Sequence, residues 1–189
     1  GRMGQVLIEA VLADRELSLV AALDAAGSPA IGKLAGGLEI GSDLGALARA
    51  DVLVDFTRPE GTLAHLEACL KHGKPLVVGT TGFSEAQKAR IAEGARRIPV
   101  VVSPNFAIGV NVVFRLAQTA AKALGDAYDV EIVEAHHRHK VDAPSGTALR
   151  LGELVAGALG RRLDEVATHG RVGDTGERPA KAIGFHAIR

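Results

Sequence analysis

Short apolar runs alternate with helical patterns along the first half of the chain, and this alternation is the feature that most limits its fold. Asp51–Thr57, Pro75–Val78 and Val100–Ser103 have the composition of buried strands. Helical patterns separate them, at Pro59–His72 and after Ser84, a residue type that caps helices. Parallel strands need such crossover helices. We therefore predict an α/β fold, with a Rossmann-like doubly wound parallel sheet covered on both faces.

The first residues resemble part of a dinucleotide-binding fingerprint. Gly1 and Gly4 lie at the start of a helical pattern, with the spacing of the second half of G-x-G-x-x-G. Asp24 follows about 20 residues later, at the end of a strand pattern, where an acidic group accepts hydrogen bonds from ribose hydroxyls. Two simpler roles stay open: Gly4 only allows close helix packing, and Asp24 only ends a strand.

If the fingerprint is real, the strand that should precede it is absent from this sequence. In a sheet of order 3-2-1-4-5 that strand lies between the strands predicted at 17–23 and 52–56. We then expect these two strands to lie about 9 to 10 Å apart, twice the usual spacing, without a ladder between them.

After Asn105 the order of the elements changes. We predict a long helix, a strand, a second helix and a last strand, at Val110–Leu124, Asp129–His137, Ser145–Leu159 and Ala182–Ile188. This order predicts two domains, a dinucleotide-binding domain at 1–107 and an incomplete α+β substrate-binding and oligomerisation domain at 108–189.

Composition argues against several classes of function. Lys and Arg total 22, as do Asp and Glu, so no net field attracts nucleic acid or an anionic membrane. Aromatic residues make up 3% of the chain, too few for base-stacking surfaces, and no apolar run is long enough to span a bilayer. Cys69 is the only cysteine and lies among leucines, which indicates a reduced core thiol and a cytoplasmic protein.

Polar and glycine-rich segments follow three of the predicted strands. They are Asp55–Pro59, Gly79–Gly82 and Ser103–Phe106. The carboxyl ends of parallel strands form the ligand crevice of such a sheet, where glycine lets the backbone approach a cofactor and hydroxyls and amides bind it. Each segment taken alone is also compatible with an ordinary turn.

The block from Glu134 to Ala148 carries the strongest functional signal. His136 and His137 leave a strand with opposite orientations, so we expect them to have different roles. A Pro-Ser-Gly-Thr helix start follows, and its first backbone N–H groups, with the helix dipole, favour a carboxylate. Lys140 adds a full positive charge. The block predicts a pocket for a small polyanion beside a titratable acid.

A zinc site and a solvated basic loop are weaker interpretations of this block. His137 and His139 could bind zinc with His136 or Asp142, but neighbouring cations oppose a divalent ion, so we predict no metal site. A solvated basic loop would explain the charge but not its position against an anion-binding helix start. No Gly-x-Ser-x-Gly elbow or P-loop lysine supports a hydrolase or a kinase.

With these motifs, the sequence resembles the dihydrodipicolinate reductase family, now called 4-hydroxy-tetrahydrodipicolinate reductases. The similarity runs through nearly the whole chain, in five blocks: Gly1–Gly4, Asp55–Thr62, Val78–Phe83, Asn105–Asn111 and Glu134–Ala148. The resemblance implies hydride transfer from NADH or NADPH to a ring carbon of a small cyclic dicarboxylate, protonation of the neighbouring carbon and loss of water, on the pathway to diaminopimelate and lysine.

The resemblance also implies roles for individual residues. His136 and Lys140 match the catalytic histidine and the proton-donating lysine, and we leave open which of them donates the proton. His137, Gly146 and Thr147 match substrate-binding positions. The cofactor-binding positions are Gly1, Arg2, Met3, Asp24, Gly79, Thr80, Thr81, Ser103, Pro104, Asn105 and Phe106.

Three departures from the family pattern bear on these expectations. The first strand is absent, and family members continue past Arg189 to complete a sheet through which they form homotetramers. Ala25 stands where some members have an arginine beside the ribose-binding acid, so we expect NADH to serve at least as well as NADPH. The alternative to an enzyme is a non-catalytic dinucleotide-binding derivative, or a fragment without activity of its own.

Overall fold

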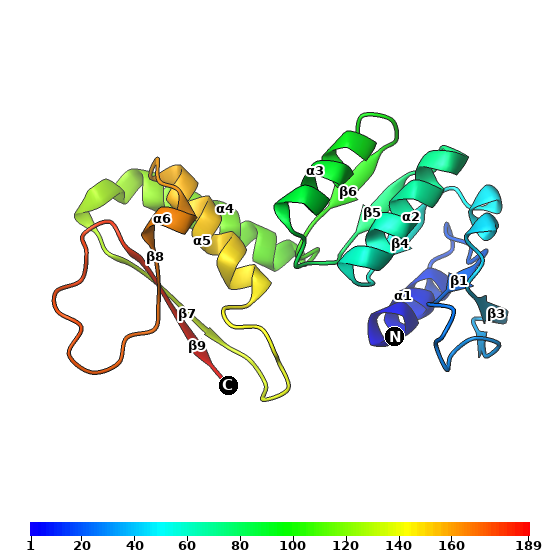
Figure 1. Cartoon of the computed structure of the whole chain (residues 1–189), viewed down its shortest axis with the longest axis horizontal. Helices are drawn as coiled ribbons and strands as arrows, with labels where there is room; N and C mark the ends of the chain where they lie inside the picture. The colour runs from blue at the N-terminus through cyan, green and yellow to red at the C-terminus, as the bar shows by residue number, and fades with distance from the viewer. The chain divides into compact units, whose positions relative to one another are not determined.

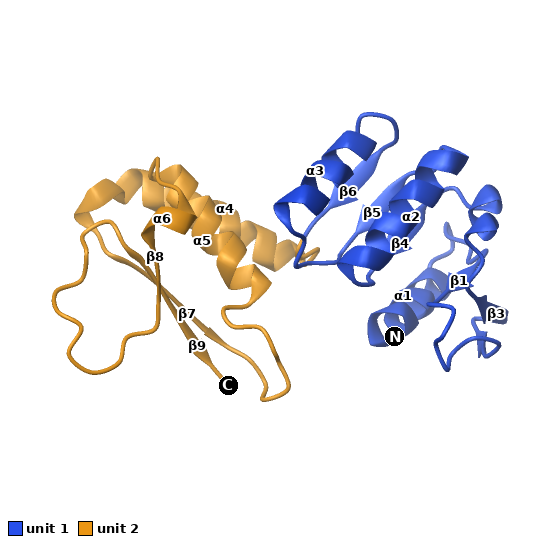
Figure 2. Cartoon of the chain, in the orientation of Figure 1, with its two compact units in different colours: residues 1–103 blue, residues 104–189 orange.

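A computed structural model describes all 189 residues, which form two compact units. The first unit comprises residues 1–103 and the second residues 104–189 (Figure 2). Each unit has its own hydrophobic core, one around Leu66 and Leu76 and the other around Ile183 and Phe185. The chain divides after residue 103, whereas the sequence predicts a boundary after residue 107.

The first unit contains three helices, six strands and a 3₁₀ turn (Figure 1). In chain order they are α1 (Arg2–Ala13), β1 (Ala22–Leu23), β2 (Leu34–Ala35), β3 (Leu38–Gly41), η1 (Leu44–Arg49), β4 (Leu53–Asp55), α2 (Pro59–His72), β5 (Leu76–Val78), α3 (Glu85–Gly94) and β6 (Val100–Val102). Strands β4, β5 and β6 form a parallel sheet in chain order. Helix α2 packs on β4 and β5, and α3 packs on α2. The predicted alternation of parallel strands and helices is confirmed.

Local sequence explains the helices of this sheet. Helix α2 has proline in its first turn and ends at Gly73, whose φ of 64° is the left-handed conformation of a helix end. Helix α3 begins at the predicted cap Ser84, which forms a capping box with Gln87. Burial raises the pKa of the Cys69 thiol, on α2, to about 11, so this side chain is an inert part of the core.

A second small sheet in the first unit was not predicted. Strand β3 pairs in parallel with β1 and antiparallel with β2. Gly36 and Gly37 join β2 to β3 with φ values of 60° and 81°, a two-residue hairpin turn that needs glycine. A Cβ on Gly36 would lie 2.8 Å from a methyl carbon of Leu19 and 3.0 Å from one of Leu12, so this glycine also lets α1 pack on the hairpin.

The predicted strand at 17–23 is wrong over most of its length. Only its last two residues pair with β3, which offers Ile40 and Gly41 as parallel partners. Leu17 is 55% exposed, so the apolar run is not a buried strand either. No ladder joins β1 to β4, which agrees with the expectation that these strands are unpaired.

The second unit contains three helices, three strands and a 3₁₀ turn. They are α4 (Ile108–Leu124), η2 (Gly125–Ala127), β7 (Val130–Ala135), α5 (Gly146–Ala158), α6 (Leu163–Val166), β8 (Ala167–His169) and β9 (Ile183–Ile188). All strands are parallel, in the order β7-β9-β8, and β8 was missed in the sequence. Helix α5 packs on β7 and β9, and α4 packs on α5. No helix of the chain has both the length and the apolar composition needed to cross a bilayer.

The two faces of the β7-β9-β8 sheet differ. Ile132 and Phe185 are buried towards the helices, and a Cβ on Gly152 of α5 would lie 2.4 Å from the Phe185 ring, so helix and sheet pack closely there. On the other face, Val133 is 64% exposed and Ile188 is 56% exposed. One side of the sheet is therefore core and the other is surface.

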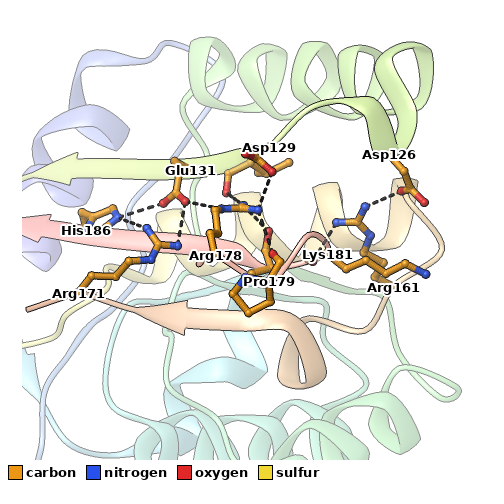
Figure 3. Close-up of polar contacts among 11 residues, drawn as sticks. Asp126, Asp129, Glu131, Arg161, Arg171, Arg178, Pro179, Lys181 and His186 are labelled. Atoms are coloured by element: carbon orange, nitrogen blue, oxygen red, sulfur yellow. Dashed lines mark hydrogen bonds and ion pairs between the residues drawn. The ribbon is translucent and has the colours of Figure 1, made fainter. Parts of the chain in front are cut away.

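Arginine side chains fasten the loop between β8 and β9 to the sheet (Figure 3). Glu131 of β7 accepts hydrogen bonds from Arg171 at 2.9 Å and Arg178 at 2.8 Å, and His186 Nε2 lies 3.0 Å from the same carboxylate. Arg178 also binds Asp129 and the carbonyl oxygens of β7 and of the loop. The Arg171 guanidinium, opposed by burial but helped by Arg178 and His186, lowers the pKa of Glu131 to about 2.

Candidate active site

The histidine-rich block leaves the carboxyl end of β7 and turns back into α5. The backbone N–H of His136 donates to the Ile188 carbonyl at 3.0 Å, so the β7-β9 ladder extends one residue into the block. The backbone N–H of Lys140 then donates to the His137 carbonyl at 3.1 Å, which closes a turn. The block therefore lies at a strand end beside a helix start, as its sequence predicts.

Lys140 and the start of α5 converge on one carboxylate. Lys140 Nζ lies 2.8 Å from Asp142 Oδ1. The Lys140 ammonium holds the pKa of the Asp142 carboxyl below its usual value, and the backbone N–H of Gly146 contributes to this effect. Two groups that the sequence assigned to substrate binding and proton donation thus face the same anion. The pair has the charge and geometry to bind a carboxylate.

Ser145 prepares the first turn of α5. Its side chain is buried, and its hydroxyl oxygen accepts from the backbone N–H of Ala148 at 3.2 Å, which caps the helix. The earlier N–H groups of the turn, at Gly146 and Thr147, have no acceptor within the helix and carry its positive dipole end. The helix start is therefore available for an anion.

His136 belongs to a second polar cluster. Its Nδ1 contacts Oε2 of Glu134, which precedes it on β7, and Arg189 binds both oxygens of that carboxylate. Arg189 also donates to the Asp142 carbonyl at 2.5 Å, which links this cluster to the Lys140 loop. Sequence reasoning gave Glu134 and Arg189 no role. Glu134 lies within the histidine-rich block, which could have drawn attention to it, but nothing in the sequence connects Arg189 to that block.

His137 and His139 lie apart from this carboxylate. Their ring centroids are 6.0 Å apart, and His137 Nδ1 accepts from the backbone N–H of His139 at 3.2 Å. His136 and His137 therefore have different environments, and their roles stay a prediction. No group of three or more histidine, cysteine or acidic side chains is arranged to bind a metal ion.

In the first unit, the start of α1 lies beside the predicted ribose-binding acid. The Gly1 nitrogen is 3.7 Å from Asp24 Oδ2. Asp24 accepts hydrogen bonds from the Ala25 backbone N–H at 2.8 Å and the Ser28 hydroxyl at 2.9 Å, and these lower the pKa of its carboxyl. The helix start and an ionised carboxylate thus lie side by side, which is compatible with the fingerprint.

Two of the predicted cofactor segments meet at a buried carboxylate. Asp55, at the end of β4, is 1% exposed and accepts from the Thr57 backbone N–H at 3.1 Å. Thr80 Oγ1, in the segment after β5, is 3.5 Å from the same carboxylate. A Cβ on Gly79 would lie 2.2 Å from the Phe56 ring, so only glycine fits below that aromatic side chain. These contacts hold the segment at the end of β4 against the segment that follows β5.

The remaining cofactor segment follows β6. Ser103 donates from its backbone N–H to the Val78 carbonyl at 3.1 Å, which places it beside the end of β5. Asn105 accepts from the Ala107 N–H at 2.8 Å through its side chain, and the Asn111 amide donates to the Asn105 and Ala107 carbonyls at 3.0 Å. Phe106 is 44% exposed. Thr81, in the segment after β5, is also exposed.

A separate cavity of about 330 Å³ lies beside β1 and β3. Val20, Leu23, Leu38, Asp43 and Arg49 are among its lining residues. None of the predicted cofactor-binding or substrate-binding residues lines it. This cavity is therefore not part of the candidate site.

Comparison with known proteins gives a family match for each of the two units. Residues 1–106 match the family model for the dihydrodipicolinate reductase N-terminus, and residues 109–189 match the model for its C-terminus. The chain is 56% identical to the 4-hydroxy-tetrahydrodipicolinate reductase of Burkholderia multivorans and 58% identical to that of Dechloromonas aromatica. Each alignment covers the whole chain and 74% of the relative.

The chain is also similar to a solved structure. The dipicolinate-bound dihydrodipicolinate reductase from Paenisporosarcina sp. TG-14 superposes with a TM-score of 0.72 at 30% identity, over the whole chain and 75% of that protein. Sequence similarity, fold and the order of the motifs all agree. The chain therefore belongs to the dihydrodipicolinate reductase family.

Proposed function

We propose that this chain catalyses the NAD(P)H-dependent reduction of 4-hydroxy-tetrahydrodipicolinate to tetrahydrodipicolinate, in the biosynthesis of diaminopimelate and lysine. Two relatives with the name of this reductase are similar to the chain over its full length. The observation that carries the proposal is the 2.8 Å ion pair of Lys140 with Asp142, in the turn between His136 and the start of α5. We propose that a carboxylate of the cyclic substrate takes the place of the Asp142 side chain there.

The chain's own groups have three tasks in this reaction. Lys140 and the first turn of α5, with His137, Gly146 and Thr147 as ligands, hold the dicarboxylate and neutralise its charge, which favours electron flow into the ring. Bound NAD(P)H supplies a hydride to one ring carbon. The hydroxyl group leaves as water together with a proton of the adjacent ring carbon, and His136 or Lys140 delivers a proton to the carbon next to the one that accepts the hydride. One hydride and one proton are consumed per molecule of tetrahydrodipicolinate and water formed.

The first unit fits a dinucleotide. Asp24 presents ionised oxygens beside the start of α1. The Gly79–Thr81 and Ser103–Phe106 segments directly follow the neighbouring strands β5 and β6. The proposed cofactor ligands are Gly1, Arg2, Met3, Asp24, Gly79, Thr80, Thr81, Ser103, Pro104, Asn105 and Phe106. NADH should serve at least as well as NADPH, because Asp24 accepts from a free 2′-hydroxyl but repels a 2′-phosphate.

We further propose a cytoplasmic homotetramer in which residues 1–107 bind the cofactor and residues 108–189 bind the substrate and contribute to assembly. The exposed Val133 and Ile188, on the sheet face that the helices leave uncovered, support a contact between subunits there. The single buried Cys69 agrees with a reducing compartment.

A non-catalytic dinucleotide-binding derivative remains the alternative function. It would not need an ordered proton donor, whereas His136 and Lys140 are both present and each has a specific carboxylate partner. Turnover distinguishes the two: only an enzyme oxidises NADH in the presence of freshly generated dihydrodipicolinate synthase product.

We expect His136→Ala or Lys140→Ala to lower kcat by at least ~100-fold, because each removes a proton donor or a charge that acts mainly in the transition state. The rate of NADH oxidation is the measurement, and the dissociation constant of NADH should hardly change. His139→Ala is the matched control in the same loop and should retain most activity. Near-normal turnover in both His136→Ala and Lys140→Ala would contradict the assigned roles.

A further inference from the structure

Glu134 has more polar partners than any other side chain of the block, although the reaction as described does not use it. Its carboxylate is 10% exposed. Oε1 accepts from the Ser145 backbone N–H at 3.2 Å and from Arg189 at 3.0 Å. Oε2 accepts from Arg189 at 3.1 Å and contacts His136 Nδ1. Both oxygens are therefore engaged, and each partner belongs to a different part of the second unit.

Arg189 keeps this carboxylate ionised and in place. The Arg189 guanidinium, opposed by burial but helped by His136 and the Ser145 N–H, lowers the pKa of Glu134 to about 2. The two guanidinium nitrogens bind both oxygens, a geometry that fixes the plane of the carboxylate. An ionised carboxylate only accepts hydrogen bonds, so the Nδ1 of His136 must be the donor in their contact.

A donating Nδ1 has a chemical consequence for the other ring nitrogen. In the neutral imidazole, a proton on Nδ1 leaves the lone pair on Nε2. Protonation of the ring then occurs at Nε2, which is the nitrogen that can afterwards deliver the proton away from Glu134. A carboxylate that fixes a histidine in this way sets both the tautomer and the direction of proton transfer.

We propose that Glu134, backed by Arg189, is a positioning residue that holds His136 with its proton on Nδ1 and its Nε2 directed to the reacting carbon. This inference rests on the proposed function, because it needs His136 to act in the reaction. Arg189 also donates to the Asp142 carbonyl, and this contact does not involve the Glu134 carboxylate.

Glu131 provides a matched comparison on the same strand. It also binds a histidine and arginines, but it lies on the opposite face of β7, with His186, Arg171 and Arg178. If both glutamates only stabilised the sheet, substitution of Glu131 and of Glu134 should have similar effects on turnover. If Glu134 positions His136, only the substitution of Glu134 should lower turnover.

The tautomer is tested first in the unmodified enzyme. We expect ¹⁵N NMR of ring-labelled histidine, at a pH where His136 is neutral, to show the proton on Nδ1, with the resonance assigned by its loss in His136→Ala. A proton on Nε2 would overturn the proposal without any further variant. This measurement does not depend on how well a Glu134 variant folds.

The second test uses Glu134→Gln in the active enzyme. We expect kcat to fall about 10- to 100-fold with KM within about 3-fold, and the His136 ring resonances to show a mixture of tautomers. In the His136→Ala background the same change should cost less than about 2-fold, because a residue that acts through His136 has nothing left to position. Glu131→Gln should leave kcat and the His136 resonances unchanged.

Three outcomes separate this inference from the proposed function. Full kcat in Glu134→Gln, together with a large loss in His136→Ala, would reject the positioning role and leave the reductase mechanism in place. Equal losses from Glu134→Gln with and without His136 would show a structural role instead. High activity in His136→Ala would reject the positioning role and leave Lys140 as the proton donor of the proposed reaction.

Discussion

We propose that cofactor choice depends on single residues beside the ribose. Asp24 is held by the Ala25 N–H and the Ser28 hydroxyl, so its carboxylate is fixed and ionised. A 2′-phosphate would bring a second negative charge to this carboxylate, and Ala25 has no charge to balance it. We therefore propose that the presence or absence of one cation sets the balance between NADH and NADPH.

We expect Ala25→Arg to raise the ratio of kcat/KM for NADPH to kcat/KM for NADH by at least ~10-fold, because a guanidinium binds phosphate bidentately. Steady-state kinetics with both cofactors measure the ratio. Ala25→Gln, which adds length without charge, should change it less than about 3-fold. A tenfold preference of the unmodified enzyme for NADPH would show that another cation, such as Arg2, already fills this role.

At the scale of elements, one buried carboxylate joins three parts of the first unit. Asp55 ends β4, its partners Thr62 and His65 lie on α2, and Thr80 follows β5. Burial opposes ionisation of Asp55, but hydrogen bonds from His65, Thr62 and Thr57 outweigh it and keep the pKa of this carboxyl below its usual value. Asp55 is thus a buried charge whose partners include two cofactor segments.

We expect Asp55→Asn to lower the free energy of unfolding by about 2 kcal/mol, because the amide presents donors to groups that now donate to a carboxylate. Urea unfolding measures the loss, and NADH titration should show weaker binding because Thr57 and Thr80 lose their common partner. Asp51→Asn, at an exposed position two residues before β4, is the control and should change neither quantity by more than experimental error. An unchanged stability of Asp55→Asn would contradict the role given to this network.

At the scale of the whole molecule, the second unit relies on ionised glutamates. Glu131 fastens the loop between β8 and β9 to the sheet, and Glu134 fastens the histidine-rich block to β9 (Figure 3 shows the Glu131 contacts). Both carboxyls have a pKa lowered from 4.5 to about 2 in the folded state. The stabilisation that they provide is complete above pH 4.5 and is lost as the pH falls towards 2.

We expect the second unit to unfold at decreasing urea concentration as the pH falls from 4.5 to about 2. Tyr128 is the single tyrosine and the chain has no tryptophan, so its fluorescence reports this unit. Glu131→Gln should be less stable at neutral pH and show a shallower decline. Glu153→Gln, which removes an exposed pair with Arg150, should follow the unmodified protein. Parallel declines in both variants and the unmodified protein would contradict the prediction.

Local sequence signals predicted most elements correctly. The proline and glycine at the ends of α2, the Ser84 cap and the apolar runs of β4 to β6 act over a few residues, and the structure confirms them. The strand at 17–23 was wrong because its partner β3 offers only two ladder positions. The β2-β3 hairpin was missed although Gly36-Gly37 is a recognisable turn signal. Short strands give weak periodicity, and only pairing reveals their extent.

The sequence by itself determined the alternation of helices with strands β4 to β6, the family, and the residue types of the candidate site. The tertiary structure decided which of these groups meet. Arg189 reaches Glu134 across 55 residues, and Arg178 reaches Glu131 across 47. Such pairs form because parallel pairing of β7 and β9 brings distant segments into register. Helix caps and turns are encoded within a few residues, whereas contacts between strands depend on how the whole unit folds, which no local pattern specifies.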